Sequence, residues 1–236
     1  MPINTKPFLV SDQSIEDAII DGDTEKVKIL LEKGVDVESV FDDFTILLRA
    51  AFEGHADIVE LILDKGADIE ANDSEGYTAL LWAVDFKHTE IVKLLIRRGA
   101  DINKADKEKT TPLIFAIMDN NLEMVKLLVE NGANIDEKDQ DGKTALVPVV
   151  YGENSRILKY LIKKGANLNN KSNDGWTPLM EAVDTGSSEI VKLLIEMGAD
   201  LQIENDKSET ALDYALRTRQ KNIAEILAAN LNASSF

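Results

Sequence analysis

Two histidines and no cysteines limit the chemistry that this 236-residue sequence could perform. His55 and His88 stand 33 residues apart, each just before an apolar stretch typical of a helix. A serine hydrolase would need one of them beside an activated serine, but no Gly-x-Ser-x-Gly elbow occurs. The absence of cysteine excludes a thiolate nucleophile and a disulfide. We therefore predict that both histidines are structural.

One segment has the spacing of a calcium-binding loop. From Asn170 to Glu181, oxygen-bearing residues occupy the first, third, fifth and twelfth places, and Gly175 occupies the sixth. However, Pro148 takes the twelfth place in the corresponding segment 33 residues earlier. A hairpin tip explains the glycine equally well, and we favour it over calcium. No phosphate-cradling or dinucleotide-binding glycine motif is present, so no cofactor is expected.

Composition and charge narrow the class of partner. Hydrophobic residues make up 44% of the sequence and charged residues 29%, which is typical of a folded protein. The net charge of -17 disfavours nucleic acid and anionic lipid and favours a basic partner, although it equally serves solubility. No apolar run reaches the roughly 18 residues of a membrane helix, and the start lacks a secretion signal. We expect a cytoplasmic monomer, with a nuclear or secreted-effector location as alternatives.

A 33-residue repeat organises the chain. Threonines open short apolar motifs at a constant interval, and glycines follow a second apolar stretch in the same phase. The motifs read TILLRAA, TALLWAV, TPLIFAI, TALVPVV, TPLMEAV and TALDYAL, starting at Thr45, Thr78, Thr111, Thr144, Thr177 and Thr210. The glycines are Gly66, Gly99, Gly132, Gly165 and Gly198, with Gly34 one residue out of step. Such self-similarity indicates a repeat architecture.

The repeat resembles that of the ankyrin family in its length, its T-P-L opening and its glycine-containing turn. The resemblance implies an all-α solenoid of about seven helix-turn-helix repeats with β-turn or hairpin tips. The histidine of the family's T-P-L-H motif is missing from every copy of the repeat. Lys87, Asn120 and Glu153 replace the usual glycine between helices, so we expect those loops to be less regular.

Each repeat can be divided into elements on local grounds. Threonine is a good N-cap, and Pro112 and Pro178 suit the first helical position. Two short helices cannot bury their apolar faces alone, so stacking must stabilise them. We expect tails at residues 1–13 and 231–236 and a repeat domain at 14–230. Within it, residues 14–39 form the N-cap, about 40–204 form five internal repeats, and 205–230 form the C-cap.

Pro148 interrupts the fourth threonine motif about four residues into its helix. An interior proline costs roughly 3 kcal/mol because it removes a backbone donor and clashes with the preceding turn. We predict a distorted first helix there, and the easiest opening point of the solenoid. Tolerated strain explains this proline more simply than a functional hinge does.

Aromatic residues are concentrated on one surface. In the ankyrin family, the tips and first helices form a concave face. The repeat phase assigns certain positions of each repeat to this face. Ten of the thirteen aromatic residues fall at these positions or in the nearby tip. Exposed aromatics commonly anchor protein interfaces, although Trp82, Phe115 and Tyr214 could equally be packing residues. The predicted contact residues are Phe44, Phe52, Glu53, Tyr77, Trp82, Asp85, Phe86, Phe115, Asp119, Tyr151 and Trp176.

These features favour a non-catalytic scaffold that binds a protein with a basic and apolar surface. One alternative is an engineered ankyrin-type binder, but the irregular copies, with Pro148 and with Lys109 at a tip, argue for a natural chain. The other alternative is an enzyme with an unrecognised acidic site, for which the sequence offers no nucleophile and base.

Overall fold

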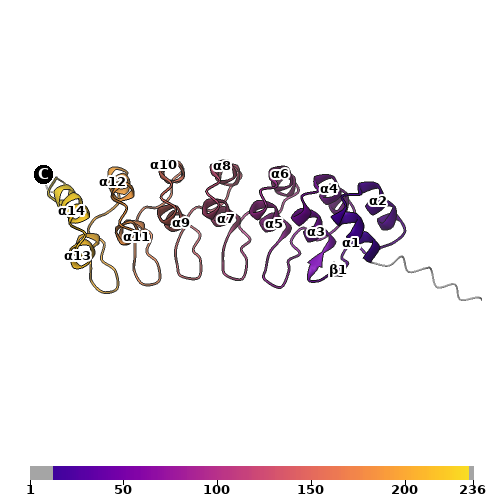
Figure 1. The fold of residues 1–236 in the computed structure, drawn as a ribbon, viewed down its shortest axis with the longest axis horizontal. Helices are drawn as coiled ribbons and strands as arrows, with labels where there is room; N and C mark the ends of the chain where they lie inside the picture. The colour runs from indigo at the N-terminus through magenta and orange to yellow at the C-terminus, as the bar shows by residue number, and fades with distance from the viewer. Residues whose placement is uncertain (1–12, 234–236) are drawn as a thin grey trace, which may run out of the picture. The chain divides into compact units, whose positions relative to one another are not determined.

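The computed structural model describes residues 13–233, which form pairs of short α-helices joined by tight turns (Figure 1). The chain divides into two compact units, residues 1–107 (unit 1) and 108–236 (unit 2). In unit 1 the elements are α1 (Gln13–Ile20), α2 (Thr24–Glu32), β1 (Val40–Phe41), β2 (Phe44–Thr45), α3 (Ile46–Glu53), α4 (Ala56–Asp64), α5 (Ala79–Asp85) and α6 (Thr89–Arg97). In unit 2 they are α7 (Pro112–Met118), α8 (Leu122–Glu130), α9 (Leu146–Tyr151), α10 (Ser155–Lys163), α11 (Pro178–Asp184), α12 (Ser188–Glu196), α13 (Ala211–Arg217) and α14 (Lys221–Ala233).

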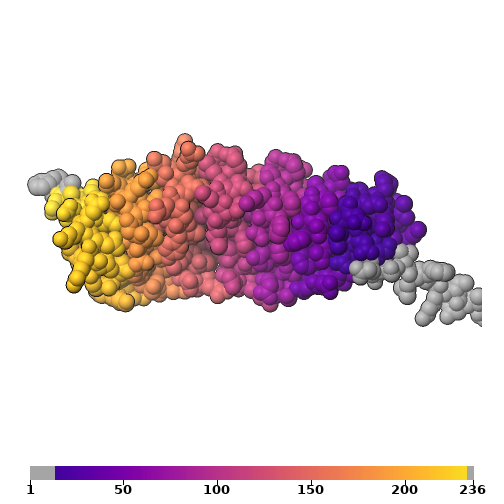
Figure 2. All heavy atoms as spheres, viewed as in Figure 1, coloured from indigo at the N-terminus to yellow at the C-terminus, as the bar shows by residue number. Residues whose placement is uncertain are grey.

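Stacking of equivalent helices buries the core of each unit. The first helices pack side by side, as α1, α3 and α5 in unit 1 and as α7, α9, α11 and α13 in unit 2. Buried alanines such as Ala50, Ala83 and Ala182 let these helices approach closely. The second helices contribute buried pairs such as Ile58 and Val59. Side chains fill the spaces between successive ribbons within each unit (Figure 2), as the predicted solenoid class requires.

The tips extend from the side of the first helices, opposite the second helices (Figure 1). In the first tip, Val40–Phe41 pairs antiparallel with Phe44–Thr45. The two residues between these strands, Asp42 and Asp43, have positive φ angles of 43° and 77°. Two consecutive left-handed residues are typical of the tight turn that joins such short strands.

Threonine caps the first helix of most repeats, as predicted. The Oγ1 atoms of Thr45, Thr78, Thr111, Thr177 and Thr210 each accept a hydrogen bond from the backbone N–H three residues later, at 3.2–3.3 Å. Such a side-chain bond satisfies one of the amides that a helix start leaves without a partner. At Thr210 the cap is reciprocal, because Asp213 accepts from the backbone N–H of Thr210.

The Pro148 repeat lacks this cap, which confirms the predicted distortion of its first helix. Helix α9 begins at Leu146, and its N-cap position is Ala145, which makes no side-chain cap bond. Because Pro148 has no N–H, the Thr144 carbonyl accepts from Val147 N instead, at 3.0 Å. The Thr144 hydroxyl oxygen is buried without a hydrogen-bond partner. The proline therefore tightens the first turn and removes the cap.

The expectation of irregular middle loops was wrong. Lys87, Asn120 and Glu153 have φ angles of 61°, 57° and 49°, so they adopt the left-handed conformation that Gly54 adopts at 87°. Each of these residues lies in the turn between the two helices of its repeat. The packed positions of those two helices determine the backbone conformation of the turn, whatever the side chain. A left-handed conformation costs a non-glycine residue roughly 1–2 kcal/mol.

The C-terminal helix differs from the predicted boundary. Helix α14 continues to Ala233, three residues past the predicted end of the C-cap at 230. Residues 231–233, Leu-Asn-Ala, contain no glycine or proline that would stop a helix. The predicted N-terminal tail lies outside the described residues except for Gln13, which begins α1. Within residues 13–233, every helix is too short or too polar to cross a lipid bilayer.

Candidate functional site

Five aromatic side chains from two adjacent repeats form one continuous cluster in unit 1, called here the aromatic cluster. Its members come from β2, α3, the second tip, α5 and the C-cap of α5. They are Phe44, Phe52, Tyr77, Trp82 and Phe86. All five were predicted as contact residues. The repeat places them together because β2, the tip and the first helices lie on the same side of the unit.

Trp82 is the centre of the aromatic cluster. Its ring centroid lies 5.3 Å from those of Phe44 and Phe52, 4.7 Å from that of Tyr77 and 5.8 Å from that of Phe86. Phe52 and Phe86 are closer still, at 4.5 Å. These separations are in the range of favourable aromatic pairs. Trp82 is thus both a packing residue and a part of the surface.

A buried carboxylate orients Trp82. Its indole Nε1–H donates to Asp73 Oδ2 at 3.0 Å. The other oxygen of Asp73 accepts from the backbone N–H groups of Glu75 and Tyr77 at 3.0 and 2.8 Å. Asp73 therefore fixes the second tip and the indole together, which holds Trp82 in one orientation within the aromatic cluster.

The aromatic cluster is partly exposed. Phe44, Phe52, Tyr77 and Trp82 are half-buried, and Phe86 is 44% exposed. The hydrophobic core is made of aliphatic side chains and lies between the helices, so the cluster is an additional apolar surface on top of it. A contiguous apolar surface of this kind is a candidate site of interaction.

Arginine and acidic residues border the aromatic cluster on the side of α1. The Arg49 guanidinium lies 4.6 Å from the centroid of the Phe44 ring. It also pairs with Glu16 at 3.0 Å and Glu53 at 3.8 Å. Glu53 was among the predicted contact residues, whereas Arg49 and Glu16 were not. Glu16 and Arg49 occupy, in their own repeats, the position that Trp82 has in the next one. This equivalence could have predicted that Glu16 and Arg49 are in contact.

The remaining predicted acidic contacts are surface residues. Asp85, near the end of α5 in unit 1, is exposed beside Phe86. In unit 2, Asp119 is the exposed C-cap that follows α7. Phe115, on α7, is half-buried.

In unit 2, Tyr151 belongs to a polar group and not to an aromatic cluster. Its hydroxyl donates to Glu181 Oε2 at 2.6 Å and accepts from Lys143 Nζ at 2.9 Å. Lys143 also pairs with Glu181 at 3.3 Å. Burial disfavours the charged ammonium, but the Tyr151 hydroxyl and the Glu181 carboxylate outweigh it and raise the pKa of Lys143. This group joins a tip to two first helices.

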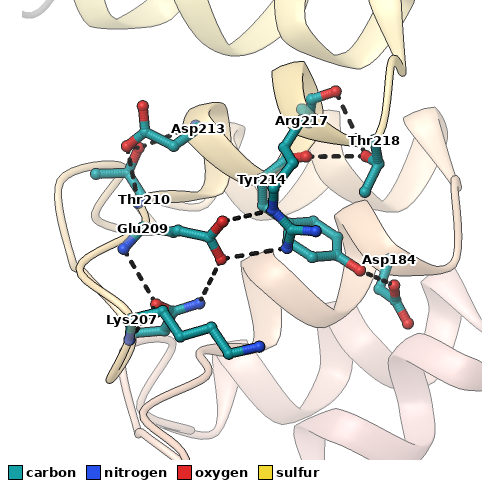
Figure 3. Close-up of polar contacts among 10 residues, drawn as sticks. Asp184, Lys207, Glu209, Thr210, Asp213, Tyr214, Arg217 and Thr218 are labelled. Atoms are coloured by element: carbon teal, nitrogen blue, oxygen red, sulfur yellow. Dashed lines mark hydrogen bonds and ion pairs between the residues drawn. The ribbon is translucent and has the colours of Figure 1, made fainter.

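Trp176 packs against Tyr214, whose polar contacts are shown in Figure 3. Their ring centroids are 4.8 Å apart, and the Tyr214 hydroxyl donates to Asp184. Arg217 lies 4.7 Å from the centroid of the Tyr214 ring and pairs with Glu209, which lowers the pKa of that carboxyl. Tyr214 is therefore a packing residue in this contact.

Both histidines have structural positions, as predicted. His88 Nε2 lies 3.1 Å from the Phe52 carbonyl oxygen, and His55 Nε2 lies 3.4 Å from that of Ile20. Each ring covers the glycine between the two helices of the preceding repeat. A Cβ atom on Gly54 would lie 2.5 Å from His88 Cε1, so glycine is needed there.

The calcium-like segment forms a hairpin tip. Ser172 accepts from Gly175 N and donates to the Trp176 carbonyl, which closes the turn. Asn170 bonds Asp136, while Glu181 bonds Lys143 and Tyr151, so the possible ligands point to different partners. The described residues contain no group of three or more histidine or acidic side chains arranged to hold a metal ion.

Comparisons with known proteins agree with this architecture. Residues 15–106, 99–172 and 149–235 match the family described as Ankyrin repeats (3 copies). Among solved structures, the chain is similar to the ankyrin repeat domain of Bcl-3, described as a unique member of the IkappaB protein family. The identity is 26%, the TM-score is 0.84, and the match covers 92% of this chain and 99% of that one. No curated protein sequence gives a significant match.

This chain belongs to the ankyrin-repeat family. Ankyrin repeat domains are protein–protein interaction modules, and their fold is typically non-catalytic.

Proposed function

We propose that this chain binds a partner protein through the face formed by its tips and first helices, with the aromatic cluster as the main contact. The observation that carries the proposal is the continuity of the five rings across two repeats, from Phe44 to Phe86. Large aromatic side chains held in place by packing lose little conformational freedom on binding, which favours their use as interface anchors.

The charge of the chain supports a partner with basic residues beside its apolar ones. The net charge is -17, and Glu53 and Asp85 lie close to the aromatic cluster. Complementary charge chiefly speeds association and selects the partner, so binding should slow as salt concentration rises. We also propose that the chain acts as a monomer in the cytoplasm.

The test is a pair of substitutions in the aromatic cluster. Tyr77→Ala together with Phe86→Ala removes two partly exposed rings and leaves Trp82 and Asp73 in place. With a partner captured from the native lysate and then purified, we expect affinity to fall at least tenfold, which is about 1.4 kcal/mol of binding free energy. Titration calorimetry measures this, and circular dichroism checks that the variant is folded.

Tyr160→Ala is the matched control. Tyr160 is a half-buried aromatic on α10, a second helix, where its hydroxyl lies 3.4 Å from Glu130 Oε1. The proposal predicts that this variant binds like the original protein. A folded Tyr77→Ala/Phe86→Ala variant with unchanged affinity would place the binding site elsewhere.

A further inference from the structure

A hollow of about 790 Å³ opens in unit 2 between α7 and α9. Ile114, Ile117 and Met118 of α7 and Val147 and Pro148 of α9 supply its apolar walls. Met118 is 68% exposed, which is unusual for a large apolar side chain and leaves it accessible from the hollow. This volume is within the range of sites that take a drug-sized ligand or a few side chains.

Pro148 explains why the hollow is in this repeat. The equivalent position in each repeat has Glu16, Arg49, Trp82, Phe115, Pro148, Glu181 and Tyr214. Where the side chain is long it reaches a neighbouring element, as Arg49 reaches Glu16 and as Tyr214 reaches Asp184. A proline ring is too short for this, so the space beside α7 stays open.

The rim of the hollow is acidic. Glu108, Asp139 and Asp141 line it, together with Lys143. The Lys143 ammonium is paired with Glu181 and bonded to Tyr151, so its charge is largely balanced. An apolar group that enters the hollow would therefore bind more tightly if the same ligand carried a positive charge next to it.

We propose that this hollow binds a segment of the partner protein in which apolar side chains stand next to a lysine or arginine. The apolar side chains would pack against Met118, Ile114 and Pro148, and the cation would lie near Asp141 and Glu108. Proline at position 148 thereby determines specificity, because it keeps the hollow open. The proposal rests on the protein-binding function proposed above, but it concerns residues of unit 2 that are separate from the aromatic cluster.

The probe is a phage-displayed library of random linear peptides, selected on the full-length protein. Enriched sequences are synthesised, and their affinities are measured by fluorescence polarisation. We expect peptides that combine Leu, Phe or Met with a nearby Lys or Arg. Pro148→Phe, which introduces the side chain that Phe115 has one repeat earlier, projects a ring into the hollow beside α7 and should weaken binding of these peptides at least tenfold.

Pro148→Ala is the matched control, because it also restores the backbone N–H but leaves the hollow open. It should bind within about twofold of the original protein, a difference under about 0.5 kcal/mol. Met118→Lys, at an exposed position, provides a second variant that blocks the hollow if Pro148→Phe does not fold. Asp141→Lys should lower the affinity of peptides that contain Lys or Arg more than that of the same peptides with Ser in place of the Lys or Arg.

The outcomes separate this proposal from the function proposed above. Peptides that lose affinity on Pro148→Phe and keep it on Tyr77→Ala/Phe86→Ala support the hollow. The proposal for the hollow is refuted if the affinities of the enriched peptides are unchanged by both Pro148→Phe and Met118→Lys. It is also refuted if the library gives no enriched peptides. Neither result bears on the aromatic cluster, which has its own test. A dimer of the original protein that Pro148→Phe dissociates would also overturn it, since the occupant would then be a second copy.

Discussion

Removing one hydroxyl group at two equivalent positions should have opposite effects on stability. Thr111 and Thr144 occupy the same place in adjacent repeats of unit 2, and each is 2% exposed. Thr111 Oγ1 accepts from Ile114 N at 3.3 Å, whereas Thr144 Oγ1 has no hydrogen-bond partner. Valine has nearly the shape of threonine, so substitution by valine removes the hydroxyl and leaves the packing volume almost unchanged.

The magnitudes follow from these contacts. Thr111→Val loses an N-cap, which costs about 1 kcal/mol. Thr144→Val removes a buried polar group that gains nothing from burial, so we expect it to stabilise the protein by about 1 kcal/mol. The two variants should therefore differ by about 2 kcal/mol in the free energy of unfolding.

Urea titration followed by tryptophan fluorescence, to which Trp176 of unit 2 contributes, measures the difference. For a slope of about 2.5 kcal/mol per M, each midpoint should move by about 0.4 M, in opposite directions. In a Pro148→Ala background the helix can begin at Thr144, so Thr144→Val should then destabilise as Thr111→Val does. Equal destabilisation by both substitutions in the original protein would refute the argument that Pro148 removes the cap.

Three further predictions concern the turns and the C-terminal cap. Gly54→Ala should destabilise by about 2–4 kcal/mol, because its Cβ would lie 2.5 Å from His88 Cε1 at a φ of +87°; Gly66→Ala, with φ +91° and nothing within 4 Å of its Cβ, should cost only about 1 kcal/mol in thermal melts. Glu153→Gly should raise stability by about 0.5–1 kcal/mol by relieving a left-handed residue, and Glu153→Ala, which keeps the Cβ, should not. Hydrogen bonds from the side chain and then the backbone of Thr210 lower the pKa of Asp213 (Figure 3), so its contribution to stability is present above the ordinary pKa of about 4 and is lost as the pH falls through the folded value. Urea midpoints of the original protein and Asp213→Asn should therefore converge as the pH falls through the lowered pKa of Asp213, and a gap that persists below it would contradict this assignment.

The repeat phase alone could predict which residues of adjacent repeats stack on one another. Because the period is 33 residues, equivalent residues of adjacent repeats must lie one above the other. The phase therefore located the threonine caps, the first-helix columns and the aromatic residues that gather in unit 1. It also indicated that Pro148 would disturb α9, since a missing N–H affects the same backbone carbonyl in any helix.

Contacts between repeats depend on how far each side chain reaches, which the phase does not specify. The sequence could not show that Arg49 lies over Phe44, that Asp73 orients Trp82, or that Tyr151 joins Lys143 to Glu181 instead of joining other rings. Nor could it show that Lys87 and Glu153 adopt glycine-like turns, because the helices packed on both sides impose that backbone conformation.

The sequence by itself determined the family, the repeat phase and the face on which aromatic residues gather, because all three depend on local periodicity. Tertiary structure decided which of those residues touch, and it revealed the hollow beside Pro148. The physical reason is that a cavity results from the reach of side chains on adjacent helices, and this appears only when the helices are packed.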